Sequence, residues 1–286
     1  MKGYYDEPAL KPPDWGWNVI AYLWLGGSAA GAFVVGALAS LRNKRGDGAI
    51  ARCAFGAATA AVLVCPALLV SHLGRPERFH HMLRVFKPSS PMNAGAWALL
   101  GLSALSVAAV ATDRSTMLRK WLPRKDVALV GLPLGLFFAT YTGVLLGHSS
   151  VPLWAASPML PALFACSSLA SGTALVSLAA AATRSVDDVG RRRLRRAERA
   201  ATAAEAIALA GWLSQVGRFG KPLTSASVRD VFQIGAIGCG IVLPMFVRAP
   251  FFCFGGALAL RYSVVVAGKL SSQDQSAYLE FTKEPR

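Results

Sequence analysis

Six residues that can exchange protons or donate hydrogen bonds lie within or at the ends of long apolar stretches. They are His72, His148, Glu205, Asn18, Tyr22 and Tyr141. An ionisable group inside a membrane is costly, so each such group is a candidate functional site. Histidine titrates near neutral pH and can pass on a proton, and tyrosine and asparagine can donate hydrogen bonds to carbonyl oxygens. The residue types therefore indicate hydrogen bonding combined with proton exchange.

The stretches that hold these residues are long enough to cross a lipid bilayer. The 286-residue chain is 54% hydrophobic and 16% charged, whereas a soluble domain carries about 25% charged residues. A helix of about 20 apolar residues spans the hydrocarbon core. We therefore expect an all-α integral membrane protein, one domain over residues 1–286 with about eight transmembrane helices. The expected spans are Asn18–Leu41, Ile50–Leu73, Met92–Thr112, Val127–His148, Met159–Thr183, Arg199–Val216, Val228–Val247 and Phe251–Leu270.

The distribution of basic residues predicts the orientation of the chain. More than half of the 30 Lys and Arg residues fall on one side, including the block RRRLRR at 191–196, and the remainder are counted on the other. Because basic loops tend to stay in the cytoplasm, both termini are expected outside, as an N-terminal segment 1–17 and a C-terminal tail 271–286. The net charge of +15 is explained by topology and anionic headgroups rather than by nucleic acid.

In this orientation, five of the six residues share one level of the membrane. Asn18 and Tyr22 begin the first span, His72 ends the second, and Tyr141 and His148 lie in the outer half of the fourth. A quinone headgroup needs hydrogen-bond donors for two carbonyl oxygens and a group that exchanges protons. We expect a quinone site here, with His72 as the proton-exchanging residue. Each residue alone also fits an interfacial anchor or, for His148, a helix end.

Glu205 lies apart from this level, nearer the cytoplasmic end of the sixth span. It is a candidate for the mouth of a proton path or for an ion pair with Arg196 or Arg199, and we favour the ion pair. Haem is not expected, because of the four histidines only His72 and His148 could form an axial pair. The cysteine spacing suits neither iron–sulfur clusters nor zinc, so no metal site is expected in this chain.

An outer loop of the sequence, LGRPERFHHMLRVFKPSSPM, is unusually basic for the side that disfavours positive charge. A docked partner protein is the simplest reason for this charge, and a solvated loop tolerated by a strong topology elsewhere is the alternative. The expected docking residues are Arg75, Arg78, Arg84 and Lys87.

The blocks YLWLGGSAAGAF and SHLGRPERFHHMLRVFKPSSPMNAGAW resemble the membrane subunits of polysulfide reductase, the NrfD/PsrC family. YTGVLLGHSSVPLW followed by LPALFACSSLASG is similar to the same family's fourth and fifth helices. The resemblance is specific in these blocks and weak in the sixth to eighth spans. The family often has an acidic residue before LGRP, where this chain has His72.

The resemblance implies a quinone-binding subunit, free of haem and iron–sulfur clusters, in a multi-subunit respiratory oxidoreductase of the bacterial inner membrane. It implies menaquinone or ubiquinone as the cofactor and Tyr141 as a quinone-contacting residue. A ferredoxin-like four-cluster iron–sulfur subunit is the implied partner, itself connected to a molybdopterin catalytic subunit or to a cytochrome. The centre that acts on the terminal substrate would then belong to a partner, and the partner's potential would set the direction of electron flow.

Two other functions are open at this point. A transporter would place its site at mid-membrane between broken helices, and Pro66, Pro133 and Pro244 could break helices, although little charge lies near them. A purely structural anchor would lack a working quinone site.

Overall fold

A computed structural model describes residues 10–87, 89–248 and 250–283, and these residues form helices and connecting loops without a β-strand. Six helices are long and apolar enough to cross a membrane, so the chain is a multi-pass helical membrane protein. A helix suits this solvent because its backbone hydrogen bonds are satisfied within the segment. The six helices are α1 (Trp17–Arg42), α2 (Asp47–His72), α4 (Pro91–Arg114), α6 (Arg124–Gly147), α8 (Leu160–Thr183) and α11 (Pro250–Gln273).

The sixth and seventh expected spans are helical but differ from the other six. The sixth forms the second half of α9 (Asp188–Val216), whose first half carries the basic block. The seventh is the shorter apolar segment Val231–Phe246, a π-helical stretch, η4 (Val231–Val242), followed by α10 (Leu243–Phe246). The count of eight spans and the outer placement of both termini stay predictions. The predicted terminal segments also fall partly on residues 1–9 and 284–286, which lie outside the described residues.

The remaining elements are short and connect the long helices. They are η2 (Pro76–Arg78), α3 (His81–Arg84), α5 (Thr116–Trp121), α7 (Pro152–Ala155), η3 (Gly217–Thr224) and α12 (Gln275–Lys283).

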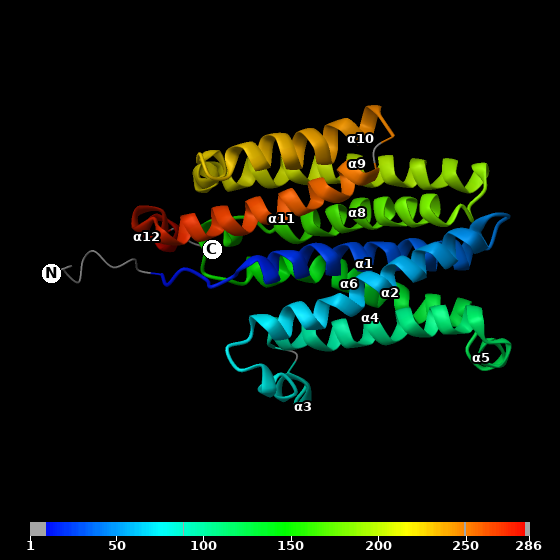
Figure 1. Ribbon diagram of the computed structural model, residues 1–286. Coiled ribbons are helices and arrows are strands. Elements are labelled where there is room, and N and C mark those ends of the chain that lie inside the picture. The colour runs from blue at the N-terminus through cyan, green and yellow to red at the C-terminus, as the bar shows by residue number, and fades with distance from the viewer. Residues whose placement is uncertain (1–9, 88, 249, 284–286) are drawn as a thin grey trace.

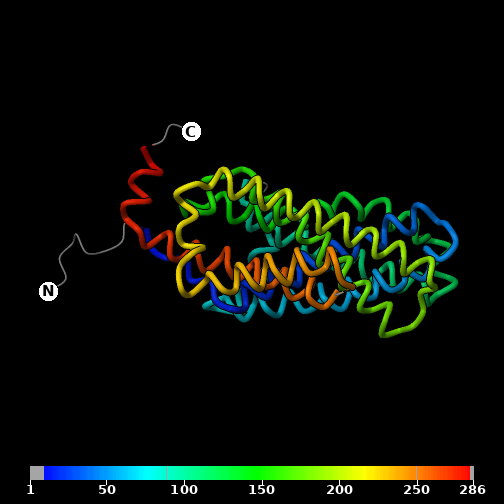
Figure 2. Tube along the Cα trace, turned by 90° about the horizontal axis from the view of Figure 1, so that it is seen from above, coloured from blue at the N-terminus to red at the C-terminus, as the bar shows by residue number. Residues whose placement is uncertain are grey.

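The long helices run side by side, with α1 in the middle of the bundle (Figure 1). Helix α1 contacts α2, α6, α8 and α11 and is the most buried of the six spanning helices. We call the end with α3 and α12 the α3 end, and the end with α5 and the α8–α9 connection the α5 end. Figure 2 shows α12 turning away from the bundle at the α3 end.

Small residues let α1 and α8 approach each other at backbone distance. A Cβ atom on Gly31 would overlap the carbonyl group of Ser168, and one on Gly172 would overlap the backbone of Gly31. Such contacts are typical of helix packing in membranes, where close approach replaces the hydrophobic effect as a source of affinity.

One basic residue was assigned wrongly by the charge count. Arg261, counted with the basic residues of the outer side, lies in the middle of α11 and is fully buried. Its side chain therefore belongs to the interior of the bundle, and the basic residues of the loops are still more biased toward the α5 end than the sequence count suggested.

Candidate functional site

The start of α1 and the end of α2 meet at the α3 end through a polar contact. Asn18 Nδ2 donates a hydrogen bond to Ser71 Oγ at 2.9 Å, and Ser71 Oγ donates to the carbonyl oxygen of Leu68 at 2.8 Å. His72 follows Ser71 directly and is the last residue of α2. The two helices therefore bring Asn18 close to the turn that carries His72.

Tyr22 and Tyr141 form the buried part of the same region. The Phe138 ring separates them, with ring centroids 6.5 Å from Tyr22 and 5.8 Å from Tyr141. Tyr22 is 3% exposed and Tyr141 4%, yet they come from helices far apart in sequence, α1 and α6. The packing of α1 against α6 thus brings together two of the predicted residues, and we call Asn18, Tyr22, His72 and Tyr141 the polar cluster.

The hydroxyl groups of both tyrosines have no hydrogen-bond partner among the described residues. Neither hydroxyl oxygen is among the fully buried polar atoms that lack a partner, so each keeps some accessible surface, and a ligand's carbonyl oxygen can accept a hydrogen bond from it. The donor set of the polar cluster therefore fits a quinone headgroup.

Gly95, near the start of α4, makes room for the Tyr141 ring. A Cβ atom at this position would overlap the ring and its hydroxyl group. The SPM-x-x-GAW block that opens α4 thus has a steric reason for its glycine. Two neighbours therefore restrict the Tyr141 ring, namely Gly95 of α4 and Phe138, whose ring stacks on that of Tyr141 at an interplanar angle of 22°.

We expect the Gly95→Ala variant to displace the Tyr141 ring and to reduce any activity that needs its hydroxyl group by about tenfold, the loss that roughly 1.4 kcal/mol of binding energy produces. Activity of the assembled complex, at matched amounts of folded protein, measures the effect. Gly56→Ala is the control, because a Cβ atom there meets nothing within 4 Å. Equal activity of the two variants would contradict the proposed contact.

His148 does not join the polar cluster. It is exposed, and its Nδ1 atom lies 3.0 Å from the carbonyl oxygen of Val144, one turn back on α6. His148 is the residue that follows the last turn of α6, so it lies at a helix end, which was the alternative interpretation for this residue. Its predicted part in binding a quinone gains no support from these contacts.

Glu205 does not pair with Arg196 or Arg199, so the favoured sequence interpretation is wrong. Glu205 is buried, and its carboxyl group interacts with Ser167 and with Arg261. The physical reason is that α9 packs against α8 and places this face toward the interior, whereas Arg196 and Arg199 are exposed on the surface of the same helix.

Arg261 is the residue of this buried network that sequence reasoning missed. Its guanidinium group donates to Ser167 Oγ at 2.5 Å, to Ser168 Oγ at 3.1 Å and to the Leu23 carbonyl oxygen at 3.3 Å. It also lies 5.1 Å from the Phe164 ring centroid, within cation–π range. The rule that flags ionisable groups inside apolar spans would have found it, since Arg261 is the one charged residue between Phe251 and Ala267.

The predicted docking loop between α2 and α4 is open to solvent. Arg75, Arg78, Arg84 and Lys87 are all exposed, and no ion pair is formed by these four among the described residues. Exposed apolar side chains lie between them, at Phe79, Val85 and Phe86. A basic surface with exposed aromatic residues is typical of a protein-binding surface.

The fold and this site define a class of protein, a multi-pass helical membrane protein with candidate polar residues at its α3 end and a buried network around Arg261 within the bundle. The family model described as polysulphide reductase, NrfD, matches residues 10–268. The chain therefore belongs to the NrfD family, which confirms the resemblance, and it is a membrane subunit of the polysulfide reductase and related type. No curated protein matches the chain.

Proposed function

We propose that this chain is the quinone-binding, electron-transferring membrane subunit of a respiratory oxidoreductase. The observation that carries the proposal is the pair of buried tyrosines, Tyr22 and Tyr141, whose hydroxyl groups lack partners among the described residues of an NrfD-family chain. The membrane is proposed to be the bacterial inner membrane, with the α3 end on its outer side.

The residues of the polar cluster would divide the work between binding and proton exchange. Bound menaquinone or ubiquinone would supply reversible two-electron, two-proton chemistry. The Tyr141 and Tyr22 hydroxyl groups would donate hydrogen bonds to its carbonyl oxygens, and Asn18 would add a third donor at the start of α1. His72, half-buried at the end of α2, would take up or release the proton.

The α2–α4 loop is proposed to bind the partner that exchanges electrons with the site. Four exposed basic residues attract an acidic surface over a distance and thus speed association, and exposed Phe79 and Phe86 can be buried on docking. A ferredoxin-like four-cluster iron–sulfur subunit, connected to a molybdopterin or cytochrome subunit, is the proposed partner. Docking at the α3 end would bring it next to the polar cluster, so electrons would travel a short distance.

Glu205 remains a candidate for the mouth of a proton path, and its charged neighbour is Arg261 rather than Arg196 or Arg199. Its partner Arg261 donates to the carbonyl oxygen of Leu23, the residue after Tyr22 in α1. Glu205 would be the residue of this path that exchanges the proton, and Arg261 would position Glu205 rather than carry the proton, because a guanidinium group stays protonated.

The Tyr141→Phe and His72→Ala variants test the proposed site in the assembled complex. Loss of one hydrogen bond predicts a quinone KM about five- to tenfold higher for Tyr141→Phe. Loss of an acid–base group predicts turnover about 100-fold lower for His72→Ala. Quinone-linked turnover in membranes or detergent measures both, and Tyr278→Phe in α12, away from the cluster, is the matched control.

The alternatives make different predictions in the same experiment. A purely structural anchor predicts that both variants keep wild-type turnover while the complex still assembles. A transporter predicts solute flux in proteoliposomes without any partner subunit. Either result would overturn the assignment of a quinone site.

A further inference from the structure

A basic pocket lies at the α5 end, far from the polar cluster. It has a volume of about 430 Å³ and is lined by α8, α9, α10 and the start of α11. Helix α10 ends and α11 begins short of the end of the bundle that α8 and α9 reach (Figure 1), and residues of both helices line the pocket. Five arginines line it: Arg184, Arg191, Arg195, Arg199 and Arg248.

The positive charge of this pocket is poorly compensated within the chain. Arg191 pairs with Asp188 at 2.8 Å, but the other four arginines form no hydrogen bond or ion pair with the described residues. By contrast, Arg193, which lies on α9 outside the pocket, forms an ion pair with Asp47 at 2.8 Å. Burial and the neighbouring guanidinium groups of Arg248 and Arg199 lower the pKa of Arg195, as expected for cations that repel one another.

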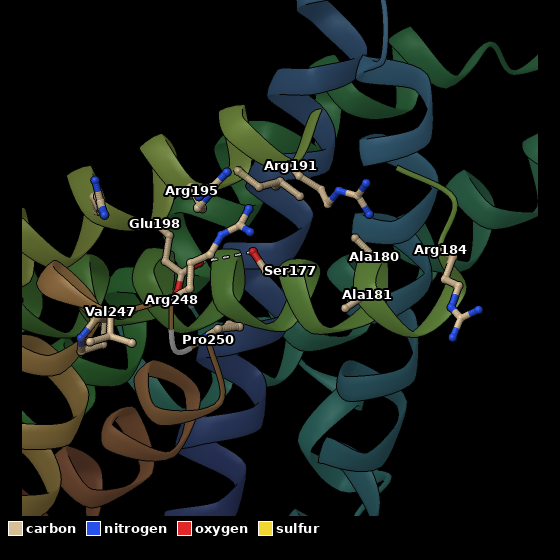
Figure 3. Close-up of a pocket in the computed structure, with 13 residues that line it drawn as sticks. Ser177, Ala180, Ala181, Arg184, Arg191, Arg195, Glu198, Val247, Arg248 and Pro250 are labelled. Carbon is tan, nitrogen blue, oxygen red and sulfur yellow. Dashed lines mark hydrogen bonds between the residues drawn. The ribbon is translucent and has the colours of Figure 1, made fainter. Parts of the chain in front are cut away.

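A single carboxylate faces the arginines inside the pocket. Glu198 is 7% exposed and accepts a hydrogen bond from Ser177 Oγ at 3.3 Å. Figure 3 shows Glu198 beside Arg248 and Arg195, with Arg184 and Arg191 farther along the pocket. Asp188, which pairs with Arg191 and also interacts with Arg195 and Arg248, is a second nearby carboxylate. Two carboxylates cannot neutralise five guanidinium groups, so the pocket favours an additional anion.

The surface next to the pocket is apolar. Phe246 is 78% exposed and Phe251 70%, and Val247, Phe252 and Val242 are exposed as well. These side chains lie on η4, at the end of α10 and at the start of α11, and Val247, which follows α10, also lines the pocket. A ligand that matches both surfaces needs an anionic head and a hydrocarbon tail, whereas a free anion would use the arginines alone.

We propose that this pocket binds the phosphate headgroup of an anionic phospholipid, with its acyl chains along Phe246 and Phe251. Arg195, Arg199 and Arg248 hold the phosphodiester by charge-assisted hydrogen bonds, and basic pockets between transmembrane helices are suited to such headgroups. The bound lipid fills the space beside the short α10–α11 turn and connects α9 to α11.

Native mass spectrometry of the full chain in detergent tests this proposal. Phosphatidylglycerol, phosphatidylethanolamine and inorganic phosphate are titrated as separate probes. We expect one phosphatidylglycerol bound per chain, with affinity about 30-fold weaker in the Arg195→Gln/Arg248→Gln variant, which removes two cations from the phosphate. Arg52→Gln/Lys120→Gln removes the same charge from exposed positions outside the pocket at the same end and is expected to bind lipid as the wild type does.

A variant that removes a negative charge from the pocket distinguishes a change in lipid affinity from a folding defect. Glu198→Gln removes the one carboxylate in the pocket while its amide oxygen can still accept from Ser177, so phosphatidylglycerol should bind several-fold more tightly. A folding defect would not increase affinity. The proposal is overturned if phosphatidylethanolamine binds as tightly as phosphatidylglycerol, if the two double variants lose lipid binding to the same extent, or if Glu198→Gln weakens binding. It is also overturned if inorganic phosphate binds as tightly as the lipid, because that result would assign the pocket to a free anion.

Discussion

Replacing Glu205 by Gln is expected to lower the free energy of unfolding of the chain by about 3 kcal/mol, because it removes the buried carboxylate whose charge acts on the buried Arg261. Arg261 is fully buried, and its other contacts are hydroxyl groups, carbonyl oxygens and the Phe164 ring. These neutral groups stabilise a cation less than a carboxylate does. Chemical or thermal unfolding in detergent, followed by tryptophan fluorescence, measures the effect.

A double-mutant cycle distinguishes the interaction between Glu205 and Arg261 from the loss of packing that each substitution causes by itself. Glu205→Gln/Arg261→Gln removes both charges, so it should be less destabilised than the sum of its two single variants. Glu77→Gln, which replaces an exposed carboxylate in the α2–α4 loop, is the control and should leave stability unchanged. Additive effects of the two single variants would show that Glu205 and Arg261 do not stabilise each other.

The second large effect is expected at the contact between α1 and α8. Gly31→Ala places a Cβ atom against the carbonyl group of Ser168, and a backbone atom cannot move aside as the end of a flexible side chain can. We expect a loss of about 2 to 3 kcal/mol, typical of an overpacked core. Because Ser168 also accepts a hydrogen bond from Arg261, separation of the helices would weaken the buried network as well.

The matched control for this substitution is Gly56→Ala in α2, where a Cβ atom meets nothing within 4 Å. Alanine favours a helix over glycine by about 0.5 to 1 kcal/mol, so this variant should be as stable as the wild type or more so. Unfolding curves of the two variants under identical detergent conditions make the comparison. Similar stabilities would mean that α1 and α8 are not in backbone contact.

Much of the candidate site follows from sequence position alone. Asn18, Tyr22, His72 and Tyr141 each lie near the end of an apolar stretch, and alternating helix directions bring these ends to one side of the bundle. Depth in the membrane could therefore be predicted without knowing which helices touch. The position of His148 on the same level was predicted in the same way, but depth carries no information about direction, and the side chain faces its own backbone at Val144.

The network of Arg261 and Glu205 marks the limit of such reasoning. Glu205 lies only six residues from Arg199 in the sequence, which made a surface pair within one helix plausible. Its partner instead comes from α11, 56 positions later, because α8 packs against both α9 and α11. A pairing between helices depends on their rotation about their own axes, and small residues throughout these helices leave that rotation weakly specified by the hydrophobic pattern.

The sequence by itself determined that this chain crosses a membrane in several helices and that it resembles the NrfD family, and it predicted five candidate polar residues at one depth. These properties follow from hydropathy, charge distribution and local motifs, which act over short distances along the chain. The tertiary structure alone decided that Gly95 makes room for Tyr141, that Glu205 faces Arg261, and that the arginines of α9 line a pocket beside a short hairpin. Each of these depends on which faces of distant helices meet, and that is set by the packing of the whole bundle.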